Sequence, residues 1–189
     1  DLYETLFGLI ASCGLRLSEA LSLTVADVDL RRGVLTIRRT KFAKSRQVPL
    51  HPSTAKALGR YRWTRDVAGA SRDDDAPFFI GTRGRLFGKP ISGHQVERVF
   101  AALRTELGWI NRGTHHAPRI HDLRHTFVVR RILLWQQHGV DVDEAMLSLS
   151  TYVGHAMVTN TYWYLQAVPE LMAVAAQRFE SCMPELSHV

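Results

Sequence analysis

The sequence predicts a mixed α+β fold that is mainly α-helical and contains a small antiparallel sheet. Apolar residues recur at helical spacing through most of the chain. Between residues 26 and 50 the pattern changes to alternation, as in two short strands joined by a basic loop. The chain has 189 residues, of which 46% are hydrophobic, and this is enough for one domain with its own core. We therefore expect residues 1–189 to form a single domain.

The first third of the chain predicts two helices followed by a hairpin. Residues 2–12 have one apolar helical face, formed by Leu2, Leu6, Leu9 and Ile10. Cys13–Gly14 should end this helix, and Ser18 is the expected N-cap of a short second helix that runs through Leu23. The alternation in residues 34–39 predicts a strand whose return partner is 47–50.

The remainder predicts further helices separated by loops. The apolar spacing and the loop residues between them place helices at 53–66, 92–107, 118–136, 144–150 and 169–182. Ser53 and Asp143 are the expected caps of two of these helices, and Phe78–Ile80 is expected to be a short strand.

Charge and cysteine content restrict the class of protein. The formal net charge is +6, which favours nucleic acid or another polyanion as a partner. The two cysteines stand alone in apolar surroundings, so we expect a reducing, cytoplasmic setting without a structural disulfide. No apolar stretch is long enough to suggest a membrane span. The chain begins at Asp1, and we expect it to be a fragment of a longer protein.

The stretch from Pro118 to Phe127 carries the densest set of ionisable side chains. His121, Arg124 and His125 are spaced i, i+3 and i+4, so on a helix they share one face. An arginine offers a planar fork for two phosphate oxygens, and a histidine beside it offers a second donor. The stretch therefore predicts a phosphodiester site, and the alternative is a solvated helix face with ordinary charges.

Two further basic positions are candidates for the same chemistry. Arg16 lies in the turn between the first two helices and is flanked by Leu15 and Leu17, so it either points inward to a defined partner or lies on the surface. The loop 41–46 is the most positive part of the chain, together with Arg31, Arg32, Arg38 and Arg39. It is either a solvated charged hairpin or a loop that reaches into a DNA groove and presents one lysine to the reaction.

These residues resemble the catalytic domain of the tyrosine recombinase (phage integrase) family at four places and in the family's order. Gly14–Leu15–Arg16–Leu17–Ser18–Glu19 resembles its first arginine motif, and Lys41 is similar to its hairpin lysine. His121–Asp122–Leu123–Arg124–His125–Thr126–Phe127 resembles its His-x-x-Arg motif. Gly154–His155, with Tyr164 nine residues later, resembles its last histidine and its nucleophile. The match covers nearly the whole chain.

The resemblance implies the tyrosine recombinase catalytic-domain fold and a reaction on double-stranded DNA. It implies cleavage and rejoining through a 3′-phosphotyrosine, with no metal, nucleotide or other cofactor. The implied catalytic residues are Arg16, Lys41, His121, Arg124, His155 and Tyr164.

The resemblance also concerns assembly. It implies a homotetramer on DNA in which the C-terminal helix, residues 169–182, docks on a neighbouring subunit. The alternative is that this helix packs on its own domain. The family's N-terminal DNA-clamping domain has no counterpart in residues 1–189, so we expect the isolated fragment to be monomeric.

Some alternatives stay open at the level of sequence. Thr40 stands where the family has a glycine before its lysine, so Lys44 is a rival to Lys41, and Tyr162 is a rival to Tyr164. A non-catalytic DNA-binding module is a second function. A zinc-dependent hydrolase is a third, with His121, His125 and His155 as metal ligands. The target DNA, and the choice among integration, excision, resolution and transposition, do not follow from the sequence.

Overall fold

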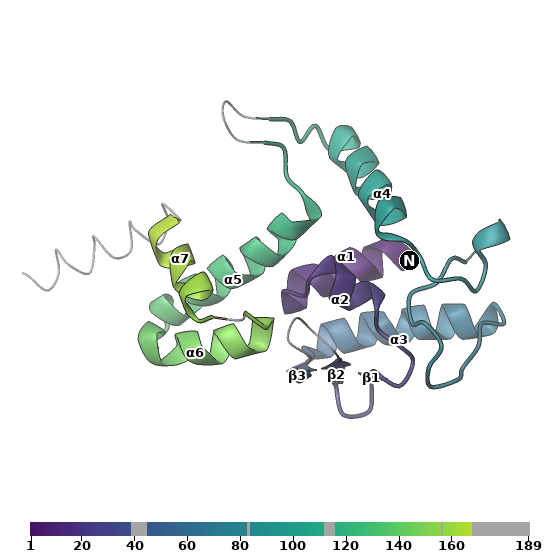
Figure 1. Cartoon of the computed structure of the whole chain (residues 1–189), viewed down its shortest axis with the longest axis horizontal. Helices are drawn as coiled ribbons and strands as arrows, with labels where there is room; N and C mark the ends of the chain where they lie inside the picture. Colours follow the sequence, from purple (N-terminus) through teal and green to yellow (C-terminus); the bar gives the residue numbers. More distant parts are fainter. Residues whose placement is uncertain (39–44, 83, 112–115, 156, 168–189) are drawn as a thin grey trace, which may run out of the picture. The chain divides into compact units, whose positions relative to one another are not determined.

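The structure, a computed structural model, describes residues 1–38, 45–82, 84–111, 116–155 and 157–167, and the side chains of the last range as far as Tyr164. The chain divides into two compact units, Asp1–Phe127 and Val128–Val189. In chain order the elements are α1 (Leu2–Cys13), α2 (Leu17–Leu21), β1 (Val28–Asp29), β2 (Val34–Ile37), β3 (Arg46–Pro49), α3 (Pro52–Val67), a 3₁₀ turn (Gly84–Leu86), α4 (Gly93–Glu106), α5 (Ile120–Gln137), α6 (Val142–Val153) and α7 (Thr159–Ala167) (Figure 1). The predicted fold class, mainly helical with a small antiparallel sheet, is confirmed.

The core of the first unit forms where α1 packs against α2 and α3. Leu6, Leu9 and Ile10 of α1 are at most 1% exposed, as are Leu58 and Tyr61 of α3. Removing a side chain of this size from water contributes roughly 1.5–3 kcal/mol, so α1 is held in place mainly by this apolar face. The predicted helix over residues 2–12 is confirmed, with its buried residues on the expected side.

The sheet has the order β1-β2-β3, with both pairs antiparallel. Val34 pairs with Pro49 and Ile37 pairs with Arg46, so the predicted hairpin is confirmed. Leu35, Ile37 and Val48 are buried on one face, as period-two alternation requires. β1 was not predicted, because two residues are too few to show a period.

Three predicted helix caps were wrong by two residues each. α2 begins after Arg16 instead of Ser18 and ends at Leu21. α3 begins after His51, whose Nδ1 accepts from the Ser53 N–H, and Pro52 occupies the first helical position. α6 begins after Asp141, whose Oδ1 accepts from the N–H groups of Asp143 and Glu144. In α3 and α6, an acceptor two residues upstream of the expected cap takes the free amides first.

Two other segments of the structure differ from the sequence prediction. Residues 78–80 form no strand of their own but contribute one isolated bridge, from Ile80 to Pro90. The helix α7, which contains Tyr164, was not predicted. The predicted helix over residues 169–182 lies outside the described residues.

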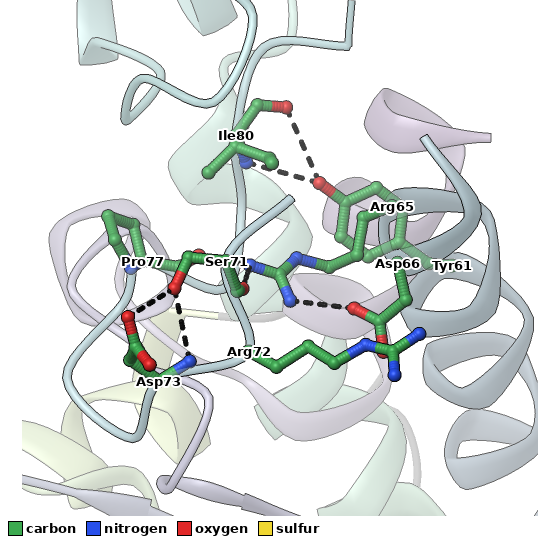
Figure 2. A network of polar contacts seen from close by, with 8 residues as sticks. All are labelled: Tyr61, Arg65, Asp66, Ser71, Arg72, Asp73, Pro77 and Ile80. Atoms are coloured by element: carbon green, nitrogen blue, oxygen red, sulfur yellow. Dashed lines mark hydrogen bonds and ion pairs between the residues drawn. The ribbon is translucent and has the colours of Figure 1, made fainter. Parts of the chain in front are cut away.

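A polar network around Arg65 fixes the loop that follows α3 (Figure 2). The Arg65 guanidinium is 1% exposed and donates to the Asp66 carboxylate and to the carbonyls of Ser71 and Pro77 at 2.9–3.1 Å. The Tyr61 hydroxyl accepts from the Ile80 N–H at 3.1 Å. These bonds satisfy buried backbone groups of a segment that has almost no regular structure. We call this group the Arg65 network.

Candidate functional site

The turn between α1 and α2 presents Arg16. α1 ends at Gly14, whose φ of 62° is left-handed and whose N–H bonds to the Ile10 carbonyl. Leu15 is buried, so it anchors the turn in the core. The Glu19 carboxylate then accepts from the Arg16 backbone N–H at 2.9 Å and from its Nη1 at 3.0 Å. The Arg16 side chain is 35% exposed, and a ligand can therefore reach it while its backbone is fixed.

Arg124 joins the second arginine motif to this turn. It lies on α5, is 1% exposed, and donates from Nη1 to the Gly14 carbonyl at 2.6 Å. Phe127, one turn further along α5, lies against Gly14: a Cβ built on that glycine would be 2.5 Å from the Phe127 ring. The two sequence motifs, more than a hundred residues apart, are therefore in direct contact within the first unit.

His121 and His125 lie on the same helix as Arg124. Their rings are 4.6 Å apart between centroids, in an edge-to-face arrangement. Partial burial, the neighbouring His125 and the Arg124 charge lower the pKa of His121 below its ordinary value of 6.5. Burial is also the main cause that lowers the pKa of His125. Both shifts favour the neutral form of the ring, which is the form that can accept a proton.

A pocket of about 440 Å³ opens next to His121. Its lining combines apolar residues with the charged groups of Arg104, Arg119 and Glu97. His121 is itself exposed, so a ligand in the pocket can reach it.

The base of the β2–β3 hairpin is tied to the arginine turn by ion pairs. Arg46 donates from both of its Nη atoms to the two Glu19 oxygens, each at 2.9 Å. At the other strand, Arg38 pairs with the buried Asp27. Sequence reasoning counted Arg46 as one charge of a basic loop and missed this bond. Lys41 and its rival Lys44 lie outside the described residues.

Burial of Glu19 would by itself disfavour its charged form, but its hydrogen bonds reverse that effect. The bonds from Arg46 and from the Arg16 backbone outweigh burial, and the pKa of Glu19 is lowered from its ordinary value of 4.5. Glu19 therefore stays ionised at neutral pH although it is only 7% exposed.

The second unit brings His155 and Tyr164 together. Gly154 ends α6 in a left-handed conformation, and His155 follows it directly. The His155 Nδ1 lies 2.7 Å from the Thr161 hydroxyl, and its ring is stacked on that of Tyr164 with centroids 6.4 Å apart. Tyr164 is only 3% exposed.

The rival Tyr162 differs from Tyr164 in its surroundings. Its side chain is half-exposed. Burial and a hydrogen bond to Asp143 raise the pKa of its hydroxyl. The geometry thus pairs the candidate histidine with Tyr164, as the spacing of nine residues predicts.

The described residues contain neither a cluster suited to a metal ion nor a helix suited to a membrane. Among those residues, no group of three or more His, Cys, Asp or Glu side chains is placed to hold a metal ion. In the same part of the chain, no helix combines the length and the apolar character that crossing a membrane requires.

Comparison with known proteins identifies the family. The model of the phage integrase family matches residues 3–170. The chain belongs to the phage integrase family. The protein y4rB of Sinorhizobium fredii, whose name describes an integrase/recombinase, is 40% identical over 178 residues, which are 94% of this chain and 55% of y4rB.

Two further similar proteins extend the comparison. The tyrosine recombinase XerC of Chromobacterium violaceum is 33% identical over 161 residues, which cover 85% of this chain and 46% of XerC. The crystal structure of the XerH recombinase bound to its difH DNA in a post-cleavage complex superposes with a TM-score of 0.66 at 23% identity, over 94% of this chain and 46% of XerH. The chain thus spans about half the length of the curated relatives that it matches.

Proposed function

We propose that this chain is the catalytic part of a site-specific DNA recombinase that cleaves and rejoins double-stranded DNA through a 3′-phosphotyrosine. The observation that carries the proposal is the bond from Arg124 to the Gly14 carbonyl, which joins the two arginine motifs of a phage integrase family member. The related XerH recombinase has been crystallised on its DNA substrate, which supports DNA as the ligand. The cytoplasm, where such DNA lies, is the proposed location.

In the proposed reaction the arginines act on the scissile phosphate. Arg16 and Arg124 bind its non-bridging oxygens and stabilise the charge that develops at the pentavalent transition state. His155 donates a hydrogen bond to a non-bridging oxygen. Guanidinium groups supply positive charge of the kind that other nucleases take from a metal ion, so the proposed reaction needs no cofactor.

The covalent step involves two oxygens of the phosphodiester. The Tyr164 hydroxyl attacks phosphorus, forming a bond to the 3′-phosphate as the bond to the 5′ oxygen breaks. Lys41 gives a proton to the leaving 5′ oxygen, with Lys44 as the alternative donor. His121 accepts the tyrosine proton or donates to the phosphate. The phosphotyrosine retains the energy of the broken bond, so attack by a 5′-hydroxyl rejoins DNA without a nucleotide.

A trapped covalent adduct tests this proposal. The whole protein that contains this chain is incubated with nicked suicide DNA, from which the cleaved fragment diffuses away, and the adduct is mapped by peptide sequencing. Tyr164→Phe should abolish the adduct, because the variant has no oxygen to attack phosphorus. Tyr162→Phe is the matched control and should still form it. The reverse pattern would move the nucleophile to Tyr162, and an absent adduct in the parent protein would leave a non-catalytic DNA-binding module.

We further propose that four copies assemble on DNA and exchange their C-terminal segments. Residues 169–182 carry an apolar side, formed by Leu171, Met172, Ala175 and Phe179, and a short helix of this kind needs a surface on which to bury it. Docking on a neighbour would move the nearby Tyr164 and limit cleavage to some of the copies at a time.

Removing residues 169–189 from the whole protein tests the exchange. The truncated protein should bind DNA as a monomer and fail to form higher complexes in native gels. Normal assembly and recombination would contradict the exchange, and outright unfolding would show that the segment packs on its own domain.

A further inference from the structure

One buried carboxylate, that of Glu19, is shared by two arginines. It accepts two bonds from Arg46 on β3 and two from Arg16, one of them from the backbone. All four donor–acceptor distances are between 2.9 and 3.0 Å. A carboxylate with this many charge-assisted bonds fixes the groups around it in one arrangement.

The two arginines are not equivalent in this arrangement. Arg46 directs both Nη atoms at Glu19 and has a side chain that is 10% exposed. Arg16 uses one Nη atom for Glu19, and its side chain is 35% exposed. Arg46 therefore serves as the main counter-ion of Glu19, while Arg16 remains accessible to a ligand.

The charge of the group has a functional consequence. The formal charges of Glu19 and Arg16 alone would sum to zero, and a neutral pair of this kind attracts an anion only weakly. With Arg46 included, the three side chains sum to +1, and the accessible part of that charge lies on Arg16. Buried charges are weakly screened by water, so a missing counter-ion would change the field at Arg16 strongly.

We propose that Arg46 is a positioning residue for DNA cleavage: it neutralises Glu19 and thereby keeps the Arg16 guanidinium oriented and available for the scissile phosphate. This inference rests on the proposed function. Because Arg46 pairs with Ile37 across β2 and β3, the same bond fixes the base of the hairpin that contains Lys41. One side chain thus connects the hairpin to the arginine turn.

Single-turnover cleavage of nicked suicide DNA by Arg46 variants tests the proposal. Arg46→Gln should slow cleavage at saturating DNA by about 10–100-fold, the range seen for outer-shell partners of metal ligands. Its affinity for DNA should change much less, because little of the Arg46 side chain is exposed. Arg46→Lys keeps the charge and should retain more activity than Arg46→Gln.

The decisive variant is the double substitution Arg46→Gln with Glu19→Gln. Removing the carboxylate charge makes its counter-ion unnecessary, so the double variant should cleave faster than Arg46→Gln alone. A double variant that is no faster, or slower, would show that Arg46 acts on DNA or on the fold independently of Glu19. Arg65→Gln is the matched control, since it makes the same change at another buried arginine bonded to a carboxylate. If its folded form loses as much cleavage, the effect of Arg46 is only loss of stability.

A measurement that does not depend on DNA cleavage distinguishes this inference from the proposed function. NMR titration of the Glu19 carboxyl should show a higher pKa in Arg46→Gln than in the parent, because the strongest favourable bond is gone. An unchanged titration would refute the ion pair in solution. If the parent forms no adduct at all, the proposed function fails first. If the parent forms the adduct and Arg46→Gln cleaves normally, only the role of Arg46 is refuted.

Discussion

Arg65 and Arg124 are both 1% exposed, yet their surroundings differ. Arg65 donates to the Asp66 carboxylate, which also pairs with Arg72, and to two carbonyls of one loop, so its bonds hold that loop against α3 (Figure 2). Arg124 donates to the carbonyl of Gly14, two residues before Arg16, and lies on the same helix as His121, whose pKa is lowered by burial, by His125 and by the Arg124 charge. Arg124 is therefore placed among the candidate site residues, whereas the Arg65 network serves the loop alone.

The sharpest test of this contrast is the same substitution at both arginines. Arg124→Lys keeps a charge but loses the bidentate fork, and removal of one such preorganised contact costs roughly 10²–10³ in rate. Cleavage of nicked DNA should fall by that factor while DNA binding persists. Arg65→Lys should leave the cleavage rate of the folded protein unchanged. Equal losses in the two variants would mean that buried arginines in this fold matter only for stability.

The converse test measures stability instead of cleavage. Arg65→Met removes one of the two arginines that pair with the Asp66 carboxylate and takes the Arg65 donor from two loop carbonyls, which should lower the free energy of unfolding by about 2–4 kcal/mol. Urea denaturation at pH 7 gives this value directly. A loss below about 1 kcal/mol, the net worth of one ordinary hydrogen bond, would show that water replaces the guanidinium and that the network is dispensable.

The smallest expected effect is a dependence on pH near Arg124. The folded-state pKa values of His121 and His125 are lowered, so protons bind the unfolded chain more readily. Their contribution to stability is therefore present above pH 6.5 and is lost as the pH falls from there through the lower folded values. The double variant His121→Gln with His125→Gln should show a flatter decline in this range. An equally steep decline would assign the dependence to other groups.

The hairpin and the helices with a clear apolar face were predicted from the sequence. In both cases the period of the apolar residues shows which face is buried, and that period differs between helix and strand. Helix starts were predicted less well. Arg16 is not a usual cap, but Glu19 bonds its backbone N–H, so the N-cap of α2 is Arg16, two residues before the predicted Ser18. Such a bond depends on a pair of residues in one turn, whereas helix-capping propensities are assigned to each residue separately.

Among the site residues, the local ones were predictable and the long-range ones were not. The step of nine residues from His155 favoured Tyr164 over Tyr162 by resemblance to the family, and in the structure the His155 ring is stacked on that of Tyr164. The bond from Arg46 to Glu19 spans 27 residues and has no local pattern. In the sequence, Glu19 is an acidic residue three positions after Arg16, and no local pattern shows that it is buried or paired with Arg46. The roles of the six candidate catalytic residues stay predictions for the experiments above.

The turn at Gly14 has a consequence for the evolution and engineering of this protein. Any single-base change in a glycine codon that alters the amino acid adds a Cβ, and here that atom would collide with the Phe127 ring at a left-handed φ. Every amino-acid change that random mutagenesis can introduce at this codon by one base is therefore expected to destabilise the turn. A library that diversifies the first arginine motif should hold Gly14 and Phe127 constant, and natural drift at one of the two positions should be found only together with a change at the other.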